Sequence, residues 1–213
     1  MTGIPDTLRR PWLWAALSLS GLTIAYNLAE AAVALWAGEA AGSIALIGFG
    51  LDSLIECTAS GFAFRRIRLE LRGGANHEIA GAENLLRRVV GWSFLALALY
   101  LAVKSAWNLW VKAVPDESLV GIALAAVSAV VMPALAWGKL KAADRLGSRA
   151  LRSEAKETIA CSLLSIILLV GLGLNAWLGW WWADPLAALA MLPWLIREGR
   201  EGIRGEACED CHA

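Results

Sequence analysis

Long apolar segments separated by clusters of charge constrain the fold of this chain more than any other feature. Hydrophobic residues fill 58% of the 213 positions and charged residues only 18%, whereas soluble domains are about 45–50% apolar and about 25% charged. A helix needs roughly 20 apolar residues to cross the ~30 Å hydrocarbon core of a bilayer. The sequence therefore predicts an all-α, polytopic membrane protein and excludes a soluble globular domain.

Six apolar segments between charge clusters predict six membrane-spanning helices. The first continues for too long to be the apolar part of a secretory signal peptide. The last is short, so we expect its helix to continue past Arg197. We predict a membrane domain over residues 1–204, a short tail over residues 205–213, and spans at residues 12–37, 43–64, 89–111, 119–137, 158–178 and 183–196.

The Lys and Arg residues predict the orientation of these spans. All but two of the 19 lie before span one, between spans two and three, between spans four and five, or after span six. Basic loops stay on the cytoplasmic side, so we expect both termini in the cytoplasm and an integral protein of a bacterial inner membrane. The formal net charge of +0 gives no reason to expect a nucleic acid as partner.

Four residues in span two and at the start of span five form pairs with the same spacing. Asp52 and Glu56 in span two are four residues apart, as are Glu157 and Cys161 at the start of span five, and this spacing places each pair on one helix face. An ionisable residue in a span costs at least ~2.5–3.5 kcal/mol and is a functional candidate by default. Two facing helices would present four ligand atoms, the number that a tetrahedral divalent metal site requires.

A short repeat precedes both pairs. Ser43-Ile-Ala-Leu begins nine residues before Asp52, and Ser148-Arg-Ala-Leu begins nine residues before Glu157. Glu157 lies at the edge of its apolar segment, however, whereas Asp52 lies near the middle of span two. The two pairs can meet only if the fifth helix begins near Arg149, with its first turns lining a water-filled cavity.

Other interpretations of these residues stay open at this stage. Asp52 and Glu56 could bond to neighbouring backbone instead of a metal, and Cys161 could be a small packing residue. Glu30 and Lys104 lie at matching depths in spans one and three, which predicts an intramembrane ion pair. The alternative is that the Lys104 side chain extends to the outer surface.

The whole pattern resembles the cation diffusion facilitator family. The resemblance rests on the six spans, on S-x-A-L followed by D-x-x-x-E in span two, on the paired residues of span five, and on the Trp182-Ala-Asp-Pro turn before span six. It implies a homodimeric transporter, not an enzyme, that exports divalent metal ions in exchange for protons. Carried over by position, the transport site would be Asp52, Glu56, Glu157 and Cys161.

The ligand set also bears on which metal is carried. In the family the span-five pair is commonly His and Asp, whereas here it is Glu157 and Cys161, and no His lies in any span. A thiolate favours Zn²⁺ and Cd²⁺, so we expect Zn²⁺ with Cd²⁺ second; carboxylates leave Fe²⁺, Mn²⁺ and Co²⁺ as alternatives. The metal is cargo, and no cofactor is expected. Alternating access would expose the ligands to each side in turn, and proton uptake by the acids would favour metal release.

Two competing functions use the same buried charges. An intramembrane metalloenzyme would need an open coordination position and a general base, and a membrane scaffold would use the charges only to set helix packing. Metal flux across sealed vesicles separates a transporter from both.

The end of the chain departs from the family pattern. Only 16 residues follow Arg197, too few for the cytoplasmic metal-binding domain that most members carry, so a dimer would have to form through the membrane helices. Cys208, Cys211 and His212 in the tail would form a loose metal-collecting segment or an end without function. Cytoplasmic thiols argue against disulfides.

Overall fold

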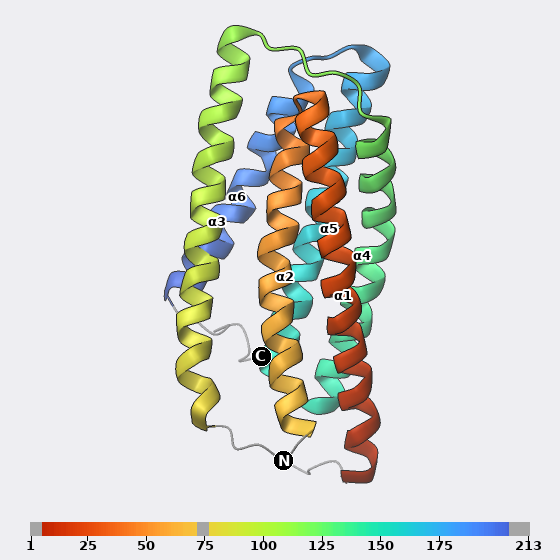
Figure 1. Ribbon diagram of the computed structural model, residues 1–213, viewed down its shortest axis with the longest axis vertical. Coiled ribbons are helices and arrows are strands. Elements are labelled where there is room, and N and C mark those ends of the chain that lie inside the picture. Colours follow the sequence, from red (N-terminus) through yellow and green to blue (C-terminus); the bar gives the residue numbers. More distant parts are fainter. Residues whose placement is uncertain (1–5, 72–76, 205–213) are drawn as a thin grey trace.

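The computed structural model describes residues 6–71 and 77–204, with side chains described for residues 9–71, 88–148 and 151–204. These ranges form long helices, each antiparallel to the next along the chain (Figure 1). The all-α prediction is confirmed, and the last helix does continue past Arg197. The helices are α1 (Asp6–Ala41), α2 (Ile44–Leu71), α3 (His77–Val111), α4 (Leu119–Leu146), α5 (Arg149–Leu178) and α6 (Ala183–Arg204).

The helices extend well beyond the apolar segments that predicted them. The segments expected as cytoplasmic loops are largely helical, because α2 continues to Leu71, α4 continues to Leu146 and α5 already begins at Arg149. Among the described helices, α1 to α5 each contain a stretch that is long and apolar enough to cross a membrane. The charged second half of α6 keeps it out of that group, so a sixth span remains a prediction.

Local sequence explains where the middle helices begin and end. The Ser118 hydroxyl before α4 accepts a hydrogen bond from the Gly121 N–H at 3.1 Å, which satisfies one of the free donors of a helix start. Gly147 and Gly179 follow α4 and α5 with φ of 62° and 65°. This left-handed conformation ends a helix at little cost only when the residue is glycine, so both links can be short.

Two groups of helices make up the structure. α1 packs on α2 and α4, and α5 packs on α4 and α2, which gives a four-helix bundle. α3 packs mainly on α6, and this α3–α6 pair joins the bundle through α2 and α5. In Figure 1, α3 stands at one side with α6 crossing behind it.

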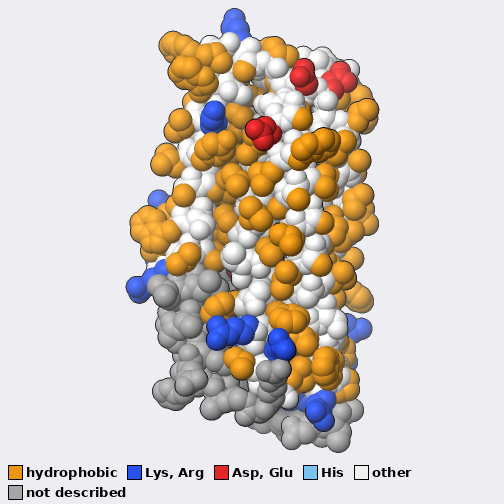
Figure 2. Space-filling model, viewed as in Figure 1, with side chains coloured by type: hydrophobic (Ala, Val, Ile, Leu, Met, Phe, Trp, Pro, Cys, Tyr) orange, Lys and Arg blue, Asp and Glu red, His pale blue; other side chains and the backbone are white. Residues whose placement is uncertain are grey.

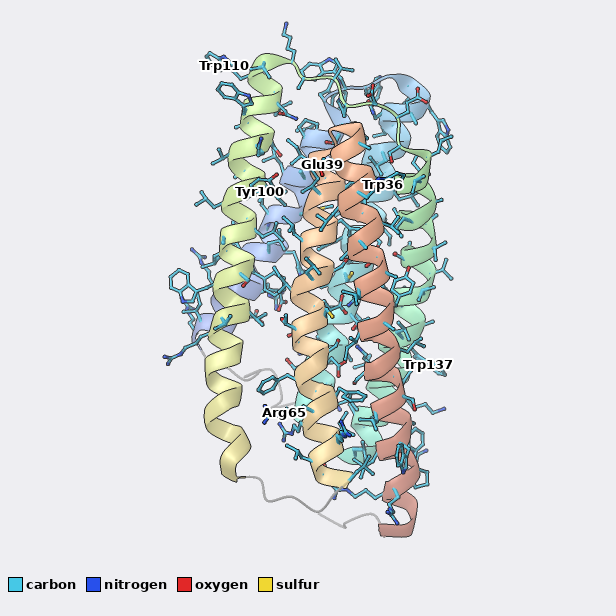
Figure 3. All side chains as sticks on the ribbon, in the orientation of Figure 1. Trp36, Glu39, Arg65, Tyr100, Trp110 and Trp137 are labelled. Carbon is cyan, nitrogen blue, oxygen red and sulfur yellow. The ribbon has the colours of Figure 1, made fainter. Side chains whose placement is uncertain are left out.

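Aromatic and basic side chains are distributed as in a protein surrounded by lipid. Figure 2 shows a surface that is mostly hydrophobic along the helices, with most of the Lys and Arg side chains on this face in its lower half. Trp36, Trp110 and Trp137 point away from the bundle (Figure 3) and are 67%, 85% and 68% exposed. Tryptophans near helix ends match the aromatic belts of membrane proteins.

Candidate metal-transport site

The repeated Ser-x-Ala-Leu segments are helix starts. The Ser43 hydroxyl accepts a hydrogen bond from the Leu46 N–H at 3.1 Å before α2, and the Ser148 hydroxyl accepts one from the Leu151 N–H at 3.4 Å before α5. Serine at this position commonly caps a helix. The shared offset of nine residues therefore places Asp52 and Glu157, the first member of each pair, at the same distance of about 13 Å from the start of their helices.

The start of α5 at Arg149 explains how Glu157, at the edge of its apolar segment, can lie near Asp52 in the middle of span two. α5 begins at Arg149, as the meeting of the two pairs required, so Glu157 lies two turns inside the helix rather than at its end. α2 and α5 are antiparallel neighbours (Figure 1). Three of the four predicted ligands consequently line one cavity: Asp52, Glu56 and Glu157.

This cavity lies between the bundle and the α3–α6 pair. Its walls come from α2, α3, α5 and α6, and its volume of about 10 Å³ is roughly what one water molecule needs. Asp52 and Glu56 are 5% and 4% exposed, whereas Glu157 is partly exposed. The lining residues are Asp52, Glu56, Phe94, Glu157, Ala160, Trp194 and Glu198.

Glu56, which lines this cavity, has one carboxylate oxygen without a hydrogen-bond partner. Its Oε1 accepts a hydrogen bond from the Thr158 hydroxyl at 2.8 Å, while its Oε2 is buried without a hydrogen-bond partner. A buried carboxylate oxygen without a partner carries a large desolvation cost. A bound cation or proton would offset that cost.

The four predicted ligands are near one another but do not form a coordination shell in this structure. Cys161 is buried at 1% exposure and is not among the residues that line the cavity. Within the described residues, no three His, Cys, Asp or Glu side chains are placed to hold one metal ion. The assignment of all four as ligands therefore stays a prediction.

Glu30 and Lys104 do not form the predicted ion pair. Glu30 is buried, as expected, but its carboxylate accepts hydrogen bonds from the hydroxyls of Ser53, at 2.8 Å, and Ser128. Lys104 is exposed on α3, which packs mainly on α6 rather than on α1. Equal depth in two spans places two residues at the same level of the membrane. It does not establish that their helices are neighbours, and α1 and α3 are not close neighbours here.

A buried ion pair escaped the sequence reasoning. Lys139 of α4 is 0% exposed, and its Nζ lies 2.8 Å from Oε1 of Glu154 in α5. The Lys139 ammonium also donates to the Thr158 hydroxyl at 2.9 Å. From the sequence, Lys139 and Glu154 lie in a charged cytoplasmic loop. Charged residues are common in such a loop, so nothing distinguishes these two as buried. Helices that continue through that segment bring them inside the bundle.

Glu198 is the other residue missed at this site. It lines the same cavity from α6, beyond the predicted end of span six at residue 196. Only the continuation of the α6 helix to Arg204 brings it beside the acids of α2 and α5. The tail residues Cys208, Cys211 and His212 lie outside the described residues.

The turn before α6 has a defined structural role. Both carboxylate oxygens of Asp184 accept hydrogen bonds at the start of α2, from the Ser43 hydroxyl at 2.5 Å and the Ile44 N–H at 2.9 Å. Asp184 is fully buried. The motif therefore ties the start of α6 to the start of α2.

Comparison with known proteins agrees with the motifs and the fold. The family model of the cation efflux transmembrane domain matches residues 21–204. The chain is also 27% identical over 173 residues to a protein from Synechocystis sp. that is named an uncharacterized transporter. That match covers 80% of this chain but only 56% of the relative.

The family match covers most of the chain, and it defines a class of membrane proteins that move metal cations. This protein belongs to the cation efflux family, the cation diffusion facilitators that its motifs resemble.

Proposed function

We propose that this protein exports divalent metal ions of the Zn²⁺ class from the cytoplasm in exchange for protons. The observation that carries the proposal is the cavity between α2, α5 and the α3–α6 pair, where Asp52, Glu56 and Glu157 converge and Glu56 presents an oxygen without a partner. Carboxylates bind metal in their ionised form. The same groups can therefore hold a cation in one state and a proton in the other.

The proposed transport cycle depends on the position of the cavity between the four-helix bundle and the α3–α6 pair. With the cavity open to the cytoplasm, Asp52, Glu56, Glu157 and Cys161 would take up a metal ion. Movement of the α3–α6 pair relative to the bundle would then open the cavity to the other side, where protonation of the acids releases the ion. The excess of basic residues beside the predicted cytoplasmic loops supports this direction and the placement of both termini in the cytoplasm.

Selectivity for Zn²⁺ and Cd²⁺ would depend on Cys161, since a thiolate favours these ions over harder ones. The residues that line the cavity are carboxylates rather than the thiol. Mn²⁺, Fe²⁺ and Co²⁺ are therefore the competing cargo ions to measure beside Zn²⁺. A homodimer held through the membrane helices is part of the proposal, and cross-linking in native membranes tests it.

Zinc flux into sealed proteoliposomes tests the function. We expect Asp52→Asn and Glu157→Gln to abolish uptake, and Glu39→Gln to leave it unchanged, because Glu39 is an exposed acid near the end of α1. Each substitution replaces one carboxyl group by an amide of nearly the same size, so the three variants differ mainly in location. Uptake at the wild-type rate by both cavity variants would reject the site, and absence of uptake by the wild-type protein would reject the function.

A further inference from the structure

A chain of buried polar groups runs from α1 to the candidate metal site. The hydroxyl of Ser20 in α1 donates to Oε2 of Glu154 in α5 at 3.0 Å, and Oε1 of Glu154 forms the ion pair with Lys139 of α4. Lys139 in turn bonds to Thr158, which bonds to Glu56 of α2. All five side chains are buried, with exposed fractions between 0% and 4%.

Thr158 connects this series of polar groups to Glu56, which lines the cavity. Its Oγ1 lies 2.9 Å from the Lys139 Nζ, 2.8 Å from Oε1 of Glu56 and 3.1 Å from the backbone oxygen of Glu154. An ammonium group can only donate, so it occupies a lone pair of the hydroxyl, and the single hydroxyl proton is left for an acceptor. The Glu56 oxygen is the nearer of the two acceptors, so the proton points to Glu56.

This arrangement orients the Glu56 carboxylate without blocking it. Thr158 engages Oε1 and leaves Oε2 without a hydrogen-bond partner, on a residue that lines the cavity. A lysine bonded directly to Glu56 would occupy a metal-binding oxygen and would repel an arriving cation. The intervening hydroxyl keeps the ammonium one group away from that carboxylate.

We propose that Lys139, Glu154 and Thr158 form a positioning relay that fixes Glu56 as a metal ligand and raises the affinity of the site for its divalent cation. The inference rests on the proposed function, since it gives these residues a part in binding the cargo. Lys139 compensates the charge of Glu154. The Thr158 hydroxyl, held by Lys139, fixes the orientation of the Glu56 carboxylate through its own hydrogen bond. None of the three needs to touch the metal.

The alternative is a clamp that only holds α1, α2, α4 and α5 together. Substituting Lys139 cannot separate the two roles, because removing one partner of a buried ion pair is strongly destabilising by itself. The Thr158 hydroxyl is the better target. Thr158→Val keeps the size and branching of the side chain and removes only the hydroxyl, whereas Thr158→Ser keeps the hydroxyl.

The test is the dissociation constant of Zn²⁺, measured by calorimetry on the purified full-length protein in detergent. We expect Thr158→Val to weaken Zn²⁺ binding by about tenfold or more, the order expected when a hydrogen bond to a charged group is lost. Thr158→Ser should bind within about threefold of the wild-type protein. Thr23→Val is the matched control, since the buried Thr23 hydroxyl bonds to a carbonyl of its own helix, that of Leu19, and its loss should leave binding unchanged.

Two results would overturn the relay: Zn²⁺ binding by Thr158→Val as tight as in the wild type, or Thr158→Ser as weak as Thr158→Val. If Thr158→Val does not accumulate, Thr158→Ala against Thr158→Ser gives the same contrast. Asp52→Asn separates the two proposals. Unchanged Zn²⁺ binding by that variant would count against the transport site itself, whereas lost binding there with a normal Thr158→Val would remove the relay alone.

Discussion

The four-helix bundle and the α3–α6 pair are held together by different kinds of contact. Inside the bundle, directional polar contacts join the helices, such as the Lys139–Glu154 ion pair at 2.8 Å and the bond from Ser53 to Glu30. Where α3 crosses α6, a Cβ atom on Gly91 would lie 2.8 Å from the backbone oxygen of Gly199. The pair is thus joined by a close backbone approach.

This difference bears on how the cavity could change access. Hydrogen bonds between buried polar groups have one favoured geometry, so the bundle would hold Glu56 and its neighbours in place. A contact between glycine-bearing helix faces depends on shape and proximity instead. We therefore expect the boundary between the two groups of helices, where Phe94, Trp194 and Glu198 line the cavity, to be the part that moves during transport.

Breaking the buried ion pair should have the largest effect on the bundle. Lys139→Met leaves Glu154 charged and buried, at a cost of about 3–5 kcal/mol in the free energy of unfolding. The double variant Lys139→Met/Glu154→Gln removes both charges and should recover much of that loss. Thermal unfolding in detergent measures both. Equal stability of the single and double variants would contradict this expectation, because it would mean that an unpaired Glu154 carboxylate carries no cost inside the bundle.

Separating α3 from α6 should impair transport more than metal binding. A methyl group on Gly91 meets backbone atoms of α6 at 2.8–3.1 Å, which cannot move aside as a side chain could, so Gly91→Ala should cost about 1–3 kcal/mol. Gly61→Ala in α2 is the control, because nothing lies within 4 Å of the added carbon. We expect Gly91→Ala to lower Zn²⁺ flux while the bundle still binds Zn²⁺. If Gly91→Ala lost Zn²⁺ binding as well as Zn²⁺ flux, the result would argue against separate roles for the bundle and the α3–α6 pair.

Replacing the buried thiol should change selectivity within the bundle. We expect Cys161→Ser to lower the ratio of Zn²⁺ to Mn²⁺ transport by about tenfold, a change of about 1.4 kcal/mol, because a hydroxyl lacks the preference of a thiolate for softer ions. Cys57→Ser serves as control, since Cys57 lies on α2, is not among the residues that line the cavity, and its Sγ contacts the Ile24 carbonyl. Competition flux assays measure the ratio. An unchanged ratio would mean that Cys161 only packs.

The smallest effect is expected from the acid that the α3–α6 pair contributes. Glu198→Gln should raise the KM for Zn²⁺ by about two- to fivefold with little change in the maximal rate, as expected for a partly exposed charge. Glu201→Gln, on the same helix and paired with Arg197 at 2.8 Å, should leave the KM unchanged. The same KM shift in both variants would indicate a general effect of charge on α6.

The fold was predictable to the extent that apolar segments define helices. The long apolar runs located α1 to α5, and the need for Asp52 and Glu157 to meet predicted the start of α5 at Arg149. In charged segments, the sequence does not distinguish residues that become buried from residues that stay exposed. Lys139 and Glu154 resemble any residues of a basic loop in the sequence, although the structure buries both.

The candidate site was predictable in part for a related reason. Acids inside apolar runs stand out, so Asp52 and Glu56 were found, and Glu157 followed from the repeat. The partners of Glu30 could not be found in this way, because Ser53 and Ser128 look like ordinary small residues of a membrane helix. Glu198 lies past the predicted end of its span, and only the continuous α6 helix places it at the cavity.

The exchange of metal for protons is tested most directly by uphill transport. Proteoliposomes with equal Zn²⁺ on both sides and an acidic lumen facing an alkaline bath would export protons down their gradient. The proposed mechanism predicts that Zn²⁺ accumulates in the lumen against its own gradient, that a protonophore abolishes the accumulation, and that Asp52→Asn shows none. Zn²⁺ that merely equilibrates, or accumulation that Asp52→Asn retains, would contradict it.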